Sequence, residues 1–220
     1  MDRWIDESLY QAWGQRLKVG RVLFEDRTAH QHLVIFENDA LGRVMMLDGA
    51  VQVTLADEFV YHEMMTHVPL FALPEPGPEP RHVLIIGGGD GGILREALKH
   101  PDIARVTMCE IDRTVVDMAL KYFPEISAGG FDDQRTQLII DDGVKLVAST
   151  LERFDAVIVD STDPHGPGAV LFEKSFYANC RRVLKPGGVL VTQNGVPFWQ
   201  GPELRKSIGH FRELFADGSC

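Results

Sequence analysis

Acidic side chains follow four apolar segments in the C-terminal two thirds of this 220-residue sequence. Asp90 lies in a glycine-rich loop, Glu110 ends the run VTMCE, Asp142 follows LIID, and Asp160 follows VIV. If these segments are parallel strands of one sheet, their carboxyl ends meet at one edge. A single acid there would commonly be a helix cap or part of a solvated turn. Four converging carboxylates repel one another, which favours a ligand that brings positive charge or hydrogen-bond donors.

A glycine loop precedes the first of these acids. Gly87, Gly89 and Gly92 match the pattern G-x-G-x-x-G, and Glu110 follows where an acid that binds ribose hydroxyls is expected. Asp90 lies inside the loop, where a dinucleotide would place its pyrophosphate, and a carboxylate there would repel phosphate. The loop therefore favours a cationic ligand of the S-adenosyl type over NAD, although Asp90 could also serve only as a helix cap.

The segment DSTDPHGPG, which begins at Asp160, is the second candidate for chemistry. It carries Asp160 and Asp163 three residues apart, and its prolines and glycines restrict the backbone. His165 could titrate near neutral pH. Turn or cap formation would explain the acids, but a loop at the carboxyl end of a strand commonly carries function.

Composition limits the classes of partner. The formal net charge is -10, from 32 acidic and 22 basic residues, which argues against nucleic acid and is compatible with a cationic substrate. Cys109, Cys180 and Cys220 show no spacing typical of a metal or redox pair, which indicates a reducing compartment. The sequence shows no signal peptide and no apolar run long enough to span a membrane, so a cytoplasmic protein without a metal is predicted.

Short apolar runs separated by turn residues predict a small antiparallel sheet near the N-terminus. Asp57 is expected to cap a helix over Glu58–Leu73. The expected strands are Arg21–Glu25, His32–Glu37, Arg43–Leu47 and Ala50–Leu55.

Prolines at positions 74, 76, 78 and 80 predict an extended linker, which divides the chain into 1–73, 74–81 and 82–220. Beyond it, strands alternate with helices, which indicates a doubly wound parallel sheet. The expected strands are His82–Ile86, Val106–Ile111, Gln137–Ile140, Asp155–Val159 and, after a turn at Lys185–Gly187, Gly188–Gln193; the expected helices are Ile93–His100, Arg113–Tyr122 and Leu171–Leu184.

Five motifs together resemble the spermidine synthase (polyamine aminopropyltransferase) family: IGGGDGGILRE, EID, DDG, DSTDPHGPG and ALGRVMMLDGAVQVTLADEFVYHEMMTHVPL. The resemblance spans essentially the whole chain. It implies an N-terminal β domain followed by a Rossmann-like, methyltransferase-type domain. Family members continue beyond the position of Cys220, so the resemblance implies that C-terminal strands are missing and that the chain is a fragment or a less active form.

The resemblance also implies a reaction, in which the aminopropyl group of decarboxylated S-adenosylmethionine moves to putrescine and gives spermidine and 5'-methylthioadenosine. The donor is a co-substrate, so no cofactor is implied. The resemblance also implies that the protein forms a homodimer or homotetramer. Asp160 would be the catalytic base, assisted by Tyr61. The implied donor site contains Gln31, Gly87, Gly89, Asp90, Glu110, Asp142, Gly143 and Pro167. The implied amine site contains His62, Asp90, Asp160, Ser161, Thr162 and Asp163.

Three alternatives stay open at this point. An S-adenosylmethionine-dependent methyltransferase would share the glycine loop, the ribose acid and the sheet. An aminopropyltransferase with another acceptor, such as spermidine or cadaverine, would share every motif. A nucleoside-binding protein without catalysis is the third alternative for a chain that ends at Cys220.

Overall fold

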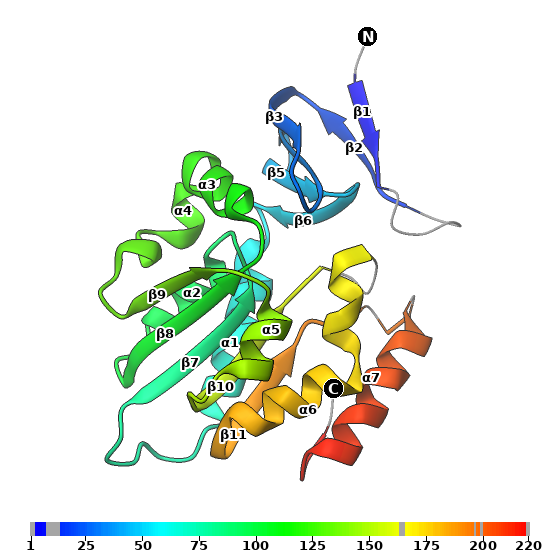
Figure 1. The fold of residues 1–220 in the computed structure, drawn as a ribbon. Helices are drawn as coiled ribbons and strands as arrows, with labels where there is room; N and C mark the ends of the chain where they lie inside the picture. The colour runs from blue at the N-terminus through cyan, green and yellow to red at the C-terminus, as the bar shows by residue number, and fades with distance from the viewer. Residues whose placement is uncertain (1–2, 8–13, 163–165, 196, 199, 219–220) are drawn as a thin grey trace.

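An antiparallel β region and a parallel α/β region make up the part of the chain described by the computed structural model, which is residues 3–7, 14–162, 166–195, 197–198 and 200–218. Figure 1 shows the antiparallel strands standing above one end of the parallel sheet. The site discussed below lies where these two regions meet.

The antiparallel region contains the four-stranded sheet expected from the sequence, with its strands in chain order. Asp48 and Gly49 both have positive φ angles, 47° and 82°, in the two-residue turn that joins its last two strands, as a tight hairpin requires. An additional two-stranded ribbon was not expected from the sequence. The strands are β1 (Arg3–Asp6) and β2 (Arg16–Val19) in the ribbon, and β3 (Arg21–Arg27), β4 (His32–Asn38), β5 (Gly42–Leu47) and β6 (Ala50–Thr54) in the sheet.

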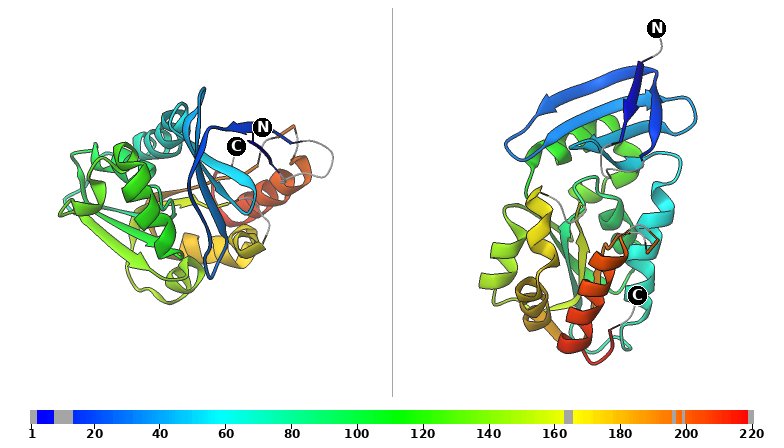
Figure 2. Two further views of the ribbon diagram at one scale, coloured as in Figure 1. Left: turned by 90° about the horizontal axis from the view of Figure 1, so that it is seen from above. Right: turned by 90° about the vertical axis from the view of Figure 1, so that its right-hand side faces the viewer.

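Alternate residues of β4 face opposite sides of this sheet, and both sides are covered. Leu33 and Ile35 pack with Phe123 and Ile126 of the parallel region, whereas Phe36 lies in a second core beneath the ribbon. Figure 2 shows the sheet seated on the two helical segments that flank Phe123, the second of which contains Ile126. The antiparallel sheet is therefore fixed to the α/β region by an apolar interface.

The parallel sheet has five strands in the order β11-β10-β7-β8-β9, which confirms the predicted doubly wound class. Its strands are β7 (Arg81–Gly87), β8 (Ile103–Glu110), β9 (Thr136–Ile140), β10 (Phe154–Asp160) and β11 (Leu184–Thr192). The helices are α1 (Glu58–Phe71), α2 (Gly92–Leu98), α3 (Arg113–Tyr122), α4 (Pro124–Ser127), α5 (Gly143–Ser149), α6 (Lys174–Val183) and α7 (Gly201–Leu214), with 3-10 turns η1 (Gly130–Asp132) and η2 (Gly166–Phe172).

Helices cover both faces of this sheet. Val83 and Ile85 of β7 pack with α1 and α2, and the alternate residues Leu84 and Ile86 pack with α5, α6 and α7. Because both faces are buried, the strands read as continuous apolar runs rather than alternating ones. The chain order reverses between β7 and β10, so their carboxyl ends flank the switch point at which ligands bind in such folds.

Helix α1 packs on the parallel sheet through a face that buries His62, Thr66, Pro69 and Leu70, while most of its other apolar side chains are exposed. Its residue Leu70 is buried in the same core as Ile93 of α2 and Val83 of β7. The division of the chain into domains at the linker 74–81 stays a prediction. By its packing, α1 belongs to the layers of the α/β region. In the described part of the chain, the helices are all too short or too polar to cross a bilayer.

The structure corrects three local expectations. Asp57 precedes α1, but its Oδ1 accepts a hydrogen bond of 2.6 Å from the Thr54 hydroxyl instead of capping the helix. Lys185–Gly187 lies inside β11, where the pairing advances by three extra residues relative to β10, so the expected turn is a bulge. The expected helix over 171–184 begins at Lys174, because η2 precedes it.

Asp112 joins the two regions. It is 3% exposed and caps α3, with Oδ1 accepting from the Thr114 amide at 3.0 Å. Its Oδ2 accepts from the Thr28 hydroxyl at 2.7 Å and from the Gln31 side-chain amide at 3.1 Å. One buried carboxylate therefore holds the β3–β4 loop against α3.

We expect Asp112→Ala to lower the free energy of unfolding by about 2–4 kcal/mol, because it removes a helix cap and leaves partly buried donors unpaired. Urea unfolding followed by circular dichroism measures this change. Asp117→Ala on the same helix is the control, since Asp117 is 44% exposed and its pair with Arg113 is a surface contact. Equal losses in the two variants would contradict the assigned role of Asp112.

Candidate active site

A cavity of about 350 Å³ lies over the carboxyl ends of the parallel strands. One wall comes from the ends of β7, β8 and β10 and the loops that follow them. The opposite wall comes from the antiparallel region and α1, including Gln31, Gln52 and Tyr61. The cavity is thus closed by segments that are far apart in the sequence.

Most of the residues implied by the resemblance line this cavity: Gln31, Tyr61, His62, Gly87, Gly89, Asp90, Glu110, Asp142, Gly143, Asp160, Ser161 and Thr162. Asp163 and His165 lie outside the described residues. Pro167 belongs to η2, and its side chain is also outside the described set.

Asp90 and Asp160 flank the switch point. Asp160 ends β10, and its Oδ1 accepts a 2.6 Å hydrogen bond from the Tyr61 hydroxyl. Burial and the neighbouring Asp90 raise the pKa of Asp160 to about 6, although His62 and the Tyr61 bond act in the opposite direction. Asp160 is therefore a better proton acceptor than an exposed aspartate, and it is still largely ionised at neutral pH.

Glu110 occupies the far end of the same cavity from the end of β8. It is 7% exposed, and its Oε1 accepts a 2.9 Å hydrogen bond from the Asp112 amide. Burial, together with the charges of Asp112 and Asp160, raises the pKa of Glu110 to about 7. The hydrogen bond from the Asp112 amide acts in the opposite direction but has a smaller effect than burial. A buried carboxyl group with a raised pKa is stabilised by hydrogen bonds from neutral donors such as sugar hydroxyls.

Asp142 caps α5, and Asp90 precedes Gly91, the N-cap of α2, and accepts from the first amide of that helix; both acids also line the cavity. The Gly92 amide donates to Asp90 Oδ1 at 2.7 Å, and the Val144 amide donates to Asp142 Oδ1 at 2.8 Å. Lys145 Nζ is 3.5 Å from Asp142 Oδ2. Across the described ranges, no lysine or arginine forms an ion pair with Asp90, Glu110 or Asp160.

Two other acids near the strand ends do not contribute to the cavity. Asp112 is used at the junction with the antiparallel region. Asp141 is exposed and accepts from the Asp142 amide at 2.7 Å. Asp112 follows β8 but does not join the acids of the cavity, because its carboxylate is turned toward α3 and the β3–β4 loop.

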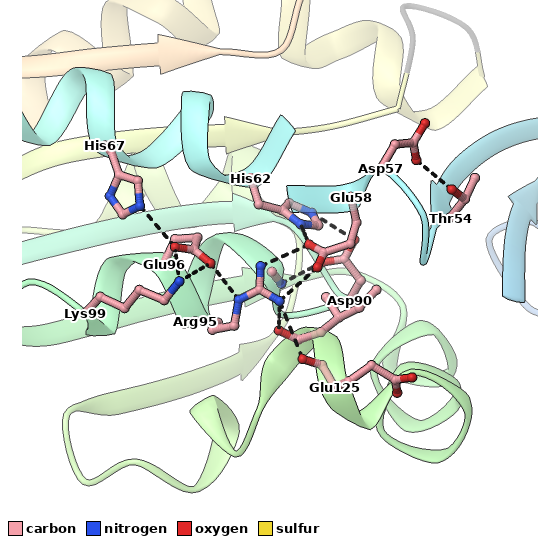
Figure 3. Close-up of polar contacts among 12 residues, drawn as sticks. Thr54, Asp57, Glu58, His62, His67, Asp90, Arg95, Glu96, Lys99 and Glu125 are labelled. Carbon is pink, nitrogen blue, oxygen red and sulfur yellow. Dashed lines mark hydrogen bonds and ion pairs between the residues drawn. The ribbon is translucent and has the colours of Figure 1, made fainter. Parts of the chain in front are cut away.

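A buried histidine supplies positive charge that the sequence interpretation did not include. His62 is 2% exposed, with Nδ1 at 2.5 Å from Glu58 Oε2 and Nε2 at 3.3 Å from Asp90 Oδ2 (Figure 3). Burial lowers its pKa, but the charges of Asp90 and Asp160 and the bonds to Asp90 and Glu58 outweigh burial and raise it to about 9. The i, i+4 spacing of Glu58 and His62 on a predicted helix was the sequence signal that could have indicated this pairing.

The antiparallel region contributes further lining residues that the motifs did not indicate, among them His30, Asp48 and Gln52. Alternation along β6 places Ala50 and Gln52 on the face toward the cavity. Cys109 also lines it, and burial raises the pKa of this thiol to about 12, so it is uncharged there.

This arrangement can bind a small molecule with cationic and hydroxyl groups. Two carboxylates converge near one end, a second pair lies at the other end, and Ile86, Met45 and Leu171 supply apolar surface between them. The described residues contain no group of His, Cys, Asp and Glu placed to hold a metal ion.

Two family profiles match the chain. The profile described as "Spermine/spermidine synthase domain" covers residues 58–219, and the profile described as "Spermidine synthase tetramerisation domain" covers residues 3–54. Together they span both structural regions, with the break between β6 and α1.

Similar proteins and structures agree with these profiles. Polyamine aminopropyltransferase 1 of Pseudomonas aeruginosa is 58% identical over 96% of this chain and 72% of its own length. A polyamine aminopropyltransferase of a Ruegeria species is 49% identical over 99% of the chain and 75% of its own length.

Two solved spermidine synthases share the fold. One, in complex with the transition-state analogue AdoDATO, has a TM-score of 0.91 at 39% identity and covers 98% of this chain and 72% of that one. The enzyme of Thermotoga maritima has a TM-score of 0.88 at 37% identity over 98% of this chain and 71% of that one. The chain belongs to the spermine/spermidine synthase family, a family of enzymes.

Proposed function

We propose that this protein is a spermidine synthase that transfers the aminopropyl group of decarboxylated S-adenosylmethionine to putrescine. The observation that carries the proposal is the pair of carboxylates, Asp90 and Asp160, which face one cavity from the two sides of the switch point. The donor carries a sulfonium and an ammonium group and no phosphate, so it matches this charge. The names of the relatives, polyamine aminopropyltransferase and spermidine synthase, support the same activity.

The donor's nucleoside fits the end of the cavity around β8 and β9. Glu110 and the side-chain oxygen of Gln31 would accept from the ribose hydroxyls, and Asp142 beside Gly143 would accept from the adenine amino group. Asp112 orients the Gln31 amide by accepting from its nitrogen, which leaves the Gln31 oxygen free to accept. Pro167 and the loop glycines Gly87 and Gly89 would contribute close apolar contact, and Asp90 would hold the donor's ammonium group.

The chemical step is a direct displacement. The lone pair of one putrescine nitrogen forms a bond to the methylene carbon beside the sulfonium, while the carbon–sulfur bond breaks and methylthioadenosine leaves with that electron pair. The attacking amine has an ordinary pKa of about 10, so it must lose a proton. Asp160 accepts this proton, and the Tyr61 hydroxyl orients Asp160 and stabilises its ionised form.

Ser161 and Thr162 line the cavity beside Asp160, and with Asp163 they would anchor the diamine. His62 lines it too, but both of its ring nitrogens face carboxylates, so we assign it to Asp90 rather than to a direct bond with an amine. The proposed reaction needs neither a metal nor a cofactor besides the two substrates.

A methyltransferase is a weaker candidate for this site. S-adenosylmethionine retains a carboxylate near its ammonium, and Asp90 and Asp160 would repel that charge. A nucleoside-binding role without catalysis would not require a carboxylate of raised pKa against a tyrosine hydroxyl.

The tetramerisation profile over residues 3–54 supports self-association. We propose a homodimer or homotetramer, in a cytoplasmic enzyme with neither nucleic acid nor membrane as a partner. The choice between the two assemblies and the cellular location stay predictions.

The expected product of this protein with decarboxylated S-adenosylmethionine and putrescine is spermidine with an equal amount of methylthioadenosine, detected by mass spectrometry. Asp160→Asn should lower kcat by a factor of about 10²–10⁴, because the base is lost, while calorimetry still detects donor binding. Spermidine or cadaverine used in preference to putrescine would refute the acceptor assignment. A variant that loses donor binding and keeps its turnover per bound donor would refute the role of Asp160.

Asp90→Asn should weaken the binding of decarboxylated S-adenosylmethionine about 10- to 100-fold and hardly change the binding of methylthioadenosine. Only the former ligand carries an ammonium group that would pair with the lost carboxylate charge. Isothermal titration calorimetry with both ligands measures the difference. Asp141→Asn, at an exposed acid that does not line the cavity, is the matched control. Equal weakening of the two ligands would show that Asp90 does not contact the aminopropyl arm.

Tyr61→Phe should make activity more sensitive to acid. The ionised form of Asp160 is required, its pKa is about 6, and loss of the Tyr61 bond raises that pKa further. The ratio of kcat/KM for the variant to that of the unaltered protein should therefore fall as the pH is lowered toward about 6. Taking the ratio removes the contribution of the amine substrate.

The control for this experiment is Tyr122→Phe, since the Tyr122 hydroxyl donates to the Leu23 carbonyl at 3.0 Å away from the cavity. Its ratio should stay constant with pH. A constant ratio for Tyr61→Phe would contradict the proposed link between the tyrosine and the base.

A further inference from the structure

Four charged side chains form an alternating row that runs from α2 to the rim of the cavity (Figure 3). Arg95 makes two bonds of 3.0 Å, from Nη1 and Nη2 to the two carboxylate oxygens of Glu58. Glu58 Oε2 is 2.5 Å from Nδ1 of His62, and Nε2 of His62 is 3.3 Å from Asp90 Oδ2. Of these four residues, only His62 and Asp90 line the cavity.

The two contacts of His62 define its protonation. An ionised carboxylate can only accept hydrogen bonds, so a ring nitrogen that faces one must carry a hydrogen. His62 faces Glu58 with one nitrogen and Asp90 with the other, and a neutral imidazole has a hydrogen on only one of them. Since His62 is also 2% exposed, its charge requires these partners in place of water.

Packing holds the ring in this orientation. Gly92, the first residue of α2, lies so close that a Cβ there would be 2.1 Å from His62 Nδ1. The backbone of α2 therefore limits how far the ring can move. The titratable or charged groups that face His62 are Glu58 and Tyr61 from α1, Asp90 from the loop after β7, and Asp160 from the end of β10, with Arg95 of α2 behind Glu58.

Arg95 is itself fixed. Besides Glu58, its Nη1 donates to the Ile126 carbonyl at 2.8 Å, and its Nε donates to Glu96 at 2.6 Å. Glu96 is fully buried and also pairs with Lys99. A planar guanidinium with a bidentate partner gives Glu58 one defined geometry.

We propose that Glu58 and Arg95 are positioning residues that keep His62 doubly protonated and hold it against Asp90. Arg95 orients the Glu58 carboxylate, Glu58 stabilises the imidazolium, and the imidazolium orients Asp90. Asp90 Oδ1 accepts a hydrogen bond from the Gly92 amide, and Asp90 Oδ2 pairs with His62. The position of Asp90 at the cavity is therefore defined before any ligand arrives. The consequence for donor binding rests on the proposed function, whereas the protonation of His62 does not.

The test is Glu58→Gln, followed by an NMR titration of the His62 ring in the protein without substrate. The amide keeps the size of the side chain and removes its charge, so the pKa of His62 should fall by about one unit or more. Decarboxylated S-adenosylmethionine should bind about 10-fold more weakly near pH 8, with a smaller change for methylthioadenosine. Arg95→Lys keeps a positive charge but loses the bidentate contact, so it should weaken the binding of decarboxylated S-adenosylmethionine less than Glu58→Gln does.

Glu63→Gln is the matched control, because Glu63 is an exposed glutamate on the same helix, and it should leave both measurements unchanged. Glu58→Asp keeps the charge and should restore the protonation of His62, which also serves as the second variant if Glu58→Gln unfolds. An unchanged His62 titration in Glu58→Gln would overturn the inference. A lowered pKa in a protein whose unaltered form transfers no aminopropyl group would sustain this inference and refute the proposed function.

Discussion

The repulsion between Asp90 and Asp160 is the constraint on which the site depends. The two carboxylates end or follow adjacent strands, β7 and β10, and face one partly closed cavity. Asp90 raises the pKa of Asp160, and two acids that face one cavity favour any positive charge that can approach them. The protein compensates part of this repulsion with His62 and leaves the remainder for a ligand. The result is a site that is prepared for a cation while it still keeps a carboxylate able to accept a proton.

Helix α1 links this electrostatic arrangement to the fold. It follows the antiparallel sheet, packs on the parallel one, and presents Tyr61 to Asp160 and His62 to Asp90 from consecutive positions. One turn earlier it presents Glu58 to Arg95. A shift of α1 would therefore change the proposed base Asp160, the proposed cation-binding acid Asp90 and their counter-charge His62 together. The apolar interface of the antiparallel sheet with α3 and α4 and the Asp112 junction oppose such a shift.

The cavity separates two kinds of recognition. Glu110, with a pKa of about 7, and Asp142 lie where neutral hydroxyl and amino donors of a nucleoside would be bound. Asp90 and Asp160 lie where positive charge is expected. This division follows from the strand order, because β8 and β9 lie on one side of β7 and β10 lies on the other.

Patterns that act over a few residues were readable from the sequence alone. They include the apolar runs of the strands, the glycine loop, and the acids Asp90, Glu110, Asp142 and Asp160, because the topology of a parallel sheet brings strand ends together. Contacts between distant segments were not readable. The bonds of Arg95 to Glu58 and of Gln31 to Asp112 depend on how α1 and the β3–β4 loop pack. The same limit applies to Asp57 and to the bulge in β11, where side-chain and strand pairing outweighed local preference. The sequence thus determined which charges meet at the sheet edge, and tertiary packing decided which of them are neutralised, since that depends on the neighbours that folding supplies.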